Sequence, residues 1–125
     1  MATTNLTVES FGKTIADNDI VFVDFWAEWC GPCRMFAPVF EAASTTHPDV
    51  VFGKVDTEVE QQLAAAANIT SIPTLMAFRD QILVFSQPGA LGGAQLEQLI
   101  TAVKGLDMDE VRKTLDAQDA AAAKA

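Results

Sequence analysis

The sequence predicts one α/β domain in which helices cover both faces of a central mixed β-sheet. The chain has 125 residues, of which 50% are hydrophobic, enough to bury one core but too few for a second domain with its own core. Strand-like apolar runs alternate with helical patterns through the first half, and two closely spaced strand-like runs follow. The alternation favours parallel strands, and the close pair favours an antiparallel hairpin.

A helix and then the central strand are expected first. Val8, Phe11 and Ile15 recur at helical spacing, which predicts an amphipathic helix from about Thr7 to Asp17. The run Ile20–Trp26 is nearly continuous in β-branched and aromatic residues, as in a strand that is buried on both faces of a parallel sheet. We therefore place this strand at the centre of the sheet.

A second helix and a second parallel strand come next. Proline is tolerated in the first turn of a helix, and apolar residues recur at helical spacing from Pro32 to about Thr46. The next strand-like run is Val50–Asp56, after which Thr57 and Glu60 have the spacing of a capping box. The helix predicted after this box extends to about Ala67.

The last part of the domain is predicted as a hairpin and a helix. The runs Thr74–Phe78 and Ile82–Phe85 are separated by three residues, close enough to pair as antiparallel strands. Leucine and isoleucine at helical spacing then predict a helix over about Ala94–Val103. These elements complete the mixed sheet and its covering helices.

A short helix and a flexible tail are expected at the C-terminus. Gly105 can end the preceding helix, Asp107 can cap a new one, and Glu110 stands three residues on as its capping-box partner. The predicted helix covers about Met108 to Ala117 and must dock on the domain, because a helix of this length is marginal by itself. Its apolar stripe consists of Met108, Val111 and Leu115. Residues Gln118–Ala125, mostly alanine, are expected to be disordered.

Composition and charge argue against several classes of partner. The formal net charge is -9, from 17 acidic and 8 basic side chains, and such a surface disfavours nucleic acids and anionic lipids. No apolar run approaches the roughly 20 residues that span a bilayer, and the first ten residues lack a basic cluster followed by an apolar stretch. We therefore expect no nucleic-acid partner, no membrane partner and a cytoplasmic location.

The two cysteines lie at the predicted junction of the central strand and the second helix, in the run Trp29-Cys30-Gly31-Pro32-Cys33. The positive end of a helix dipole favours a negative charge, which lowers the pKa of the Cys30 thiol and makes Cys30 the nucleophile. Residues three apart in a helix have β-carbons about 5 to 6 Å apart, and modest adjustment brings them to the roughly 3.5 to 4.5 Å of a disulfide. We therefore expect a reversible Cys30–Cys33 disulfide.

The cysteine pair has two other interpretations, a zinc site and inert buried thiols. A structural zinc site usually has four ligands, and the chain offers two thiols and one imidazole, that of His47. Inert buried thiols are common, but a Gly-Pro insert at a strand–helix junction disfavours them. We expect no metal and no bound cofactor besides the redox-active disulfide.

Asp24 interrupts the apolar central strand. An unpaired carboxylate buried there costs several kcal/mol, so burial should raise its pKa. Such an acid below the cysteines can take the proton from Cys33 through water. Lys54, on the adjacent predicted strand, is its natural charge partner. The alternatives are a solvated Asp24 and a Lys54 that extends to the surface.

The segment Val23–Arg34, which reads Val-Asp-Phe-Trp-Ala-Glu-Trp-Cys-Gly-Pro-Cys-Arg, resembles the active-site segment of thioredoxins. Lys54–Asp56, Ser71–Thr74 and Gly89–Ala90 follow in the family's order and spacing, so the resemblance covers about Asn5 to Lys104. It implies the thioredoxin fold, with a sheet of about five strands. Residues 1–105 then form a thioredoxin domain, and residues 106–125 form a C-terminal extension.

The resemblance also implies a function and its partners. Thioredoxins reduce disulfides in many proteins and are re-reduced, usually by a flavin-containing thioredoxin reductase that uses NADPH. We therefore expect a general protein-disulfide reductase that works as a monomer. Its expected partners are thioredoxin reductase and substrate proteins with disulfides.

Further site residues follow from the resemblance. Thioredoxins hold the proline that matches Pro73 in the cis form beside the disulfide, which lets Ile72 present its backbone to a substrate strand. Lys54, Pro73 and Trp26 take supporting roles, Trp26 as a core aromatic. The predicted substrate-binding surface around Cys30 consists of Trp29, Gly31, Pro32, Ile72, Gly89 and Ala90.

Two alternative functions and one departure from the family pattern stay open. Thiol oxidases and isomerases of the same fold often carry a histidine between the cysteines, whereas Gly31-Pro32 favours reduction. A docking subunit without redox activity is disfavoured because both cysteines and Asp24 are present. The hairpin turn carries Asp80-Gln81 where the family often has glycine, which leaves the turn geometry open.

Overall fold

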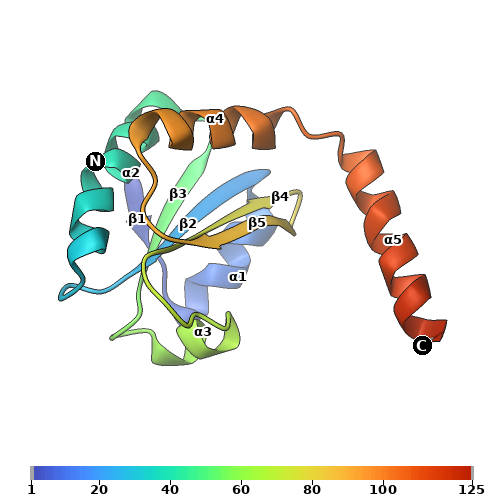
Figure 1. Ribbon diagram of the computed structural model, residues 1–125, viewed down its shortest axis with the longest axis horizontal. Coiled ribbons are helices and arrows are strands. Elements are labelled where there is room, and N and C mark those ends of the chain that lie inside the picture. The colour runs from blue at the N-terminus through green and yellow to red at the C-terminus, as the bar shows by residue number, and fades with distance from the viewer. Residues whose placement is uncertain (1, 125) are drawn as a thin grey trace.

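The computed structural model describes residues 2–124, which form a five-stranded mixed sheet in the order β1-β3-β2-β4-β5 (Figure 1). The strands are β1 (Thr3–Asn5), β2 (Ile20–Trp26), β3 (Val51–Asp56), β4 (Thr74–Arg79) and β5 (Ile82–Pro88). Strands β1, β3 and β2 are parallel, while β4 and β5 pair antiparallel to their neighbours. The prediction that β2 lies at the centre is confirmed.

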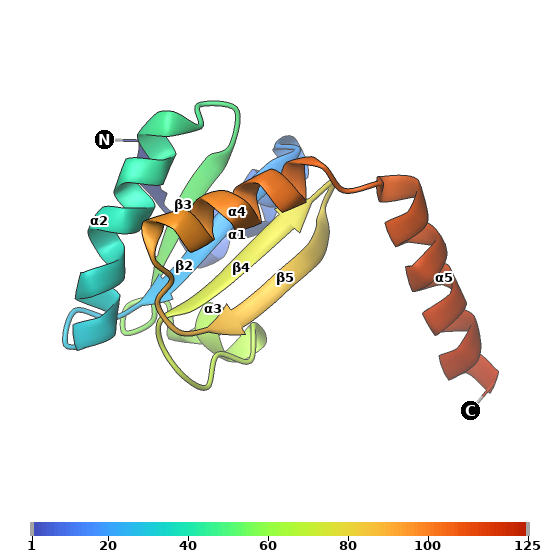
Figure 2. The same ribbon diagram turned by 45° about the horizontal axis from the view of Figure 1, so that its top comes forward.

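Helices cover both faces of this sheet. They are α1 (Val8–Asp17), α2 (Gly31–Thr46), α3 (Gln61–Ala66), α4 (Gly93–Lys104) and α5 (Met108–Lys124). Residues of α2 and α4 pack in one hydrophobic cluster, and residues of α1 and α3 pack against a second cluster on the opposite face. Both views show α5 standing apart from these layers, beyond β5 (Figures 1 and 2).

The central strand contributes to both hydrophobic clusters because its side chains alternate between the faces of the sheet. Phe22 belongs to the cluster under α2 and α4, where its ring stacks on that of Phe52. Val23 and Phe25 belong to the cluster under α1 and α3. Five consecutive residues of β2, 21 to 25, are fully buried, as the apolar run predicted.

Strand β1 was not predicted from the sequence. Its three residues, Thr3–Asn5, are polar and pair in parallel with β3. The chain then brings the buried side chain of Leu6 over Gly53 of β3, where an added β-carbon at position 53 would collide with Leu6. Because Gly53 has no side chain, β3 leaves room for Leu6, the residue that directly follows β1.

The capping box predicted from Thr57 and Glu60 is wrong. Helix α3 begins at Gln61, and its N-cap, Glu60, makes no side-chain cap bond. The Thr57 hydroxyl donates instead to the carbonyl oxygen of Trp26 at 3.0 Å, and a Glu60 carboxylate oxygen accepts from the backbone N–H of Val8 at 2.9 Å. Both side chains bond to segments that are distant in the sequence, so their local spacing gave a wrong prediction of their partners.

The β4–β5 turn lies at the end of the sheet where β2 begins, since Arg79 is in register with Ile20. Its two central residues, Asp80 and Gln81, have positive φ angles of 51° and 70°. Backbone of this kind suits tight hairpins but favours glycine. The Asp80 N–H donates to the carbonyl oxygen of Asp19 at 2.8 Å, which ties the turn to the start of β2.

Helix α5 is longer and less docked than predicted. It continues to Lys124 and not only to Ala117, in keeping with the high helix propensity of its alanines, so residues 118–124 are helical and not disordered. Ala125 lies outside the described residues. Of the apolar stripe, Met108 is buried, Val111 is half-buried, and Leu115 is 37% exposed. Only the first turns of α5 therefore pack on the domain.

Candidate active site

The two cysteines form a disulfide at the N-terminus of α2. Cys30 is the N-cap residue of this helix, and its Sγ accepts from the backbone N–H of Cys33 at 3.2 Å. Cys33 lies inside the first turn. A sulfur that already accepts a helix N–H sits where the dipole stabilises a thiolate, which is the electrostatic basis for a lowered thiol pKa in the reduced form.

The Ile72–Pro73 segment lies beside Cys30. The peptide bond between these residues is cis, as the family resemblance implied. The Ile72 carbonyl oxygen lies 3.7 Å from Cys30 Sγ, and Ile72 packs against the two cysteines. The backbone of Ile72 thus lies next to the sulfur that a substrate would meet.

An apolar cavity of about 500 Å³ opens beside Cys30. Among the predicted surface residues, Trp29, Gly31, Pro32 and Ile72 line it, together with Thr57, Ala64, Ile69, Thr70 and Ser71. Gly89 and Ala90 are exposed and lie farther along the chain, where the Gly89 N–H donates to the carbonyl oxygen of Pro73 at 2.8 Å. Gly89 is placed against Pro73 and outside the cavity wall.

The two cysteines differ in access, although both are buried in the disulfide. Cys30 is 4% exposed and contributes to the wall of the cavity, whereas Cys33 is 2% exposed and packs inward. Access therefore runs through the cavity to Cys30, and not across an open surface.

Asp24 is fully buried on the central strand. Within the described residues, neither of its carboxylate oxygens has a hydrogen-bond partner. Desolvation raises the pKa of Asp24 from 3.8 to about 7, and the positive charge of Lys54 opposes this rise. Asp24 therefore changes its protonation state near neutral pH, as a proton acceptor at this site requires.

Lys54 and Trp26 lie next to Asp24. Lys54 is in register with Asp24 on β3, but its Nζ lies 4.8 Å from the centroid of the Trp26 ring. This cation–π contact holds the ammonium group near the acid without a direct ion pair. Trp26 packs against the cysteine pair, and its indole N–H is buried with no hydrogen-bond partner among the described residues.

Glu58 is a site residue that sequence reasoning missed. Trp29 is 67% exposed, and its indole N–H donates to a Glu58 carboxylate oxygen at 2.7 Å. This bond fixes the orientation of a large aromatic ring at the mouth of the cavity. The available signal was that Glu58 follows the end of β3 while Trp29 follows the end of β2, and these parallel strands end side by side.

Residues 2–124 contain no cluster of three or more histidine, cysteine, aspartate or glutamate side chains able to hold a metal ion. Within the same residues, no helix has the length and apolar character needed to cross a bilayer.

Comparison with known proteins identifies the family. The thioredoxin family model matches residues 2–102. The chain belongs to the thioredoxin family. A putative thioredoxin 2 from Streptomyces coelicolor is 55% identical over 121 residues, covering 97% of this chain and 90% of that protein. With its Cys30–Cys33 disulfide, this thioredoxin-family protein is a thiol-disulfide oxidoreductase.

Solved thioredoxin structures have the same fold. A mutant thioredoxin from Halobacterium salinarum superposes with a TM-score of 0.77 at 32% identity, covering 83% of this chain and 92% of that one. The Plasmodium falciparum thioredoxin gives a TM-score of 0.74 at 38% identity, with coverages of 79% and 97%. The fold is thus the thioredoxin fold, and the predicted α/β class is confirmed.

The similarity to the Streptomyces protein extends into α5. A match that covers 97% of the chain leaves only a few residues outside it, so it takes in most of the helix that begins at Met108. The family model, in contrast, ends at residue 102. The sequence that forms α5 is therefore matched in at least one relative but lies beyond the part that the family model covers.

Proposed function

We propose that this protein is a general protein-disulfide reductase. The observation that carries the proposal is the Cys30–Cys33 disulfide at the N-terminus of α2, with Cys30 lining an apolar cavity beside the cis Ile72–Pro73 bond. The cavity gives a substrate disulfide access to one sulfur. The helix terminus stabilises that sulfur as a thiolate.

The reaction has two exchange steps. In the reduced protein, the Cys30 thiolate attacks one sulfur of a substrate disulfide, which forms a mixed disulfide and releases the first substrate thiolate. The Cys33 thiol then loses its proton and attacks Cys30 Sγ, which releases the second substrate thiolate and forms the Cys30–Cys33 bond. Two electrons pass from the protein to the substrate in each cycle.

Asp24 is the proposed proton acceptor for Cys33. A carboxyl group with a pKa of about 7 accepts a proton readily near neutral pH. Its two oxygens have no other hydrogen-bond partner within the described residues, so they are free to bond a water molecule that relays the proton. Lys54 and Trp26 act as supporting residues that set the charge and the packing around Asp24.

Substrate binding is proposed to use the rim of the cavity. Trp29, Gly31 and Pro32 supply apolar contact, and the backbone of Ile72 pairs with an extended substrate segment. Pro73 holds Ile72 in place, and Gly89 supports Pro73 through its N–H bond. Ala90, the next residue, is exposed and extends this surface.

The proposed electron donor is a flavin-containing thioredoxin reductase that uses NADPH, and the proposed location is the cytoplasm, where electron transport of this kind maintains cell redox homeostasis. The net charge of -9 supports a reaction with other proteins and not with nucleic acid. We propose that the protein works as a monomer without a bound cofactor.

The decisive test is substrate trapping with a Cys33→Ser variant. We expect this variant to hold mixed disulfides through Cys30, while a Cys30→Ser control holds none and neither reduces insulin. The reduction potential of the wild-type protein, measured against glutathione, should be about −270 mV, the value for thioredoxin. A strongly oxidising potential would favour a thiol oxidase, and failure of Cys33→Ser to trap any substrate would favour a docking subunit.

A further inference from the structure

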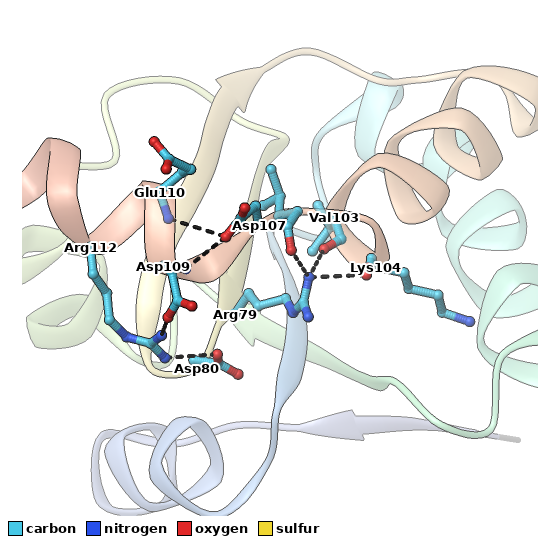
Figure 3. Close-up of polar contacts among 9 residues, drawn as sticks. Arg79, Asp80, Val103, Lys104, Asp107, Asp109, Glu110 and Arg112 are labelled. Atoms are coloured by element: carbon cyan, nitrogen blue, oxygen red, sulfur yellow. Dashed lines mark hydrogen bonds and ion pairs between the residues drawn. The ribbon is translucent and has the colours of Figure 1, made fainter.

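Arg79 of the β4–β5 hairpin holds the link between α4 and α5. The guanidinium Nη1 of Arg79 donates to the carbonyl oxygens of Val103, Lys104 and Leu106, at 2.8, 3.0 and 3.0 Å (Figure 3). These carbonyls belong to the end of α4 and the link to α5. A charged donor that gathers three carbonyls fixes the path of the chain at this point.

A second set of contacts fixes the start of α5. Asp107 Oδ1 accepts from the N–H groups of Asp109 and Glu110, at 3.1 and 3.2 Å, as an N-cap does. Arg112, one turn later, pairs with Asp80 of the hairpin turn at 2.9 Å (Figure 3). The helix is therefore held at the hairpin end, while the rest of it extends past β5 (Figure 2).

This arrangement leaves an open groove of about 420 Å³ between α5 and the beginning of β5. Strand β5 contributes Ile82, Leu83 and Val84, and α5 with its link contributes Leu106, Asp107, Glu110, Val111, Thr114, Leu115 and Gln118. Large apolar side chains on both walls remain in contact with solvent, since Leu83 is 47% and Leu115 37% exposed. An unfilled apolar groove on a charged protein indicates a binding surface.

The wall formed by β5 is an edge strand. In the described part of the chain, β5 pairs with β4 alone, so its outer backbone N–H and C=O groups are free to accept another strand. The segment Ile82–Pro88 carries no charged residue that would oppose such pairing. The geometry thus suits an extended segment better than a second helix.

Charge selects the kind of segment that fits. The groove includes two carboxylates, from Asp107 and Glu110, and no lysine or arginine is among the described residues that line it. Lys113 approaches Glu110 at 3.5 Å from outside the lining, in a pair so exposed that solvent screens it. A second copy of this chain, with its own net charge of -9, would be repelled from this surface.

We propose that the groove between α5 and β5 binds an extended, aliphatic and basic segment of a partner protein, which adds to β5 as an edge strand. Alternate side chains of the segment fill the groove against Leu83 and Leu115, and its basic side chains face Asp107 and Glu110. The surface is separate from the disulfide, because β5 begins at the end of the sheet opposite Cys30. The binding therefore needs no cysteine in the partner.

The test uses a labelled peptide of eight residues that alternates lysine and valine, with an alternating glutamate–valine peptide as the control. Fluorescence anisotropy measures binding to the oxidised full-length protein. We expect the basic peptide alone to bind, with backbone amide NMR shifts concentrated in β5 and α5. Binding should weaken with added salt, as expected for exposed charges.

Two variants locate the binding surface. Leu115→Asp and Glu110→Lys should each weaken binding by about tenfold. Glu9→Lys is the matched control for charge, because Glu9 is also exposed but lies on α1, and it should weaken binding less than about twofold. Because both test residues are exposed and distant from the cysteines, insulin reduction and helix content should not change.

Several outcomes would overturn the proposal. Equal weakening by Glu9→Lys and Glu110→Lys would show unspecific attraction to an acidic protein. NMR shifts around Trp29 would place the peptide at the redox site. Equal binding of the glutamate peptide would remove the charge argument, and a stable dimer of the free protein would make a second copy the occupant.

Discussion

Replacing Asp24 with asparagine should stabilise the protein, and the gain should grow with pH. In the folded protein the carboxyl group has a pKa of about 7 because burial disfavours its charge, whereas its ordinary value is 3.8. The difference between these values corresponds to about 4 kcal/mol of unfavourable free energy when the folded protein holds the ionised form.

The direction of the pH dependence follows from where the proton is held. Below about pH 4, Asp24 is protonated in both folded and unfolded chains and contributes no difference. Between 3.8 and about 7 the unfolded chain releases this proton while the folded protein keeps it, so wild-type stability falls as pH rises. Above about pH 7 the folded protein carries the buried charge and the full cost is reached.

Asparagine has no charge to bury, so the variant lacks this cost at every pH. We expect Asp24→Asn to raise the free energy of unfolding by up to about 4 kcal/mol near pH 8 and by almost nothing near pH 4. Urea unfolding of the oxidised proteins, followed by tryptophan fluorescence, measures the difference. Asp116→Asn, on the exposed face of α5, is the matched control and should show no such trend.

The same variant separates stability from turnover. Loss of the proton acceptor should slow the release of substrate from the mixed disulfide even as the fold becomes more stable. A stability difference that does not change between about pH 4 and pH 8 would refute the buried-charge argument. Wild-type turnover by Asp24→Asn across about pH 6 to 9 would refute the role of Asp24 as proton acceptor.

Three further outcomes are expected. Brief iodoacetamide treatment of the reduced protein near neutral pH should alkylate Cys30 before Cys33, because Cys30 caps α2 and lines the cavity. Mass mapping that finds Cys33 labelled first would reverse the two roles. Gln81→Gly should raise the free energy of unfolding by about 1 kcal/mol because φ is 70° at this position, while Gln87→Gly within β5 should lower it. Truncation after Gly105 should lower the free energy of unfolding by about 1 to 3 kcal/mol, chiefly through loss of the buried Met108 side chain. Insulin reduction should stay intact. A truncated protein with native stability but slower electron transfer from the reductase would contradict this.

Elements whose stability is local were predictable from the sequence. The seven-residue run of β2 and the helix predicted to begin near Pro32 appear where the sequence pattern places them. Strand β1 has no such pattern, because its position depends on Leu6 packing over a glycine some 50 residues later in the chain. The Thr57 and Glu60 side chains were misassigned for the same reason, since their partners are Trp26 and Val8.

The candidate site also has features that the local sequence predicts and features that it does not. The position of the cysteine pair at a helix start and the burial of Asp24 follow from one contiguous segment of sequence, and the structure places both as expected. Other features of the site depend on how separate strands align. These are the hydrogen bond between Trp29 and Glu58, the position of Lys54 over the Trp26 ring, and the position of Gly89 outside the cavity wall. No local pattern carries that information.

The opposite placement of the disulfide and the α4–α5 link has a practical consequence. Strand β2 has seven residues, from Ile20 beside the hairpin turn to Trp26 beside the cysteines, and spans about 20 Å. A protein fused after α5, or a resin that carries the chain by that helix, would therefore be attached through a helix that begins at the end of the sheet opposite Cys30 and that stands apart from the sheet. Immobilised in this orientation, the molecule should exchange disulfides with dissolved proteins as freely as it does in solution.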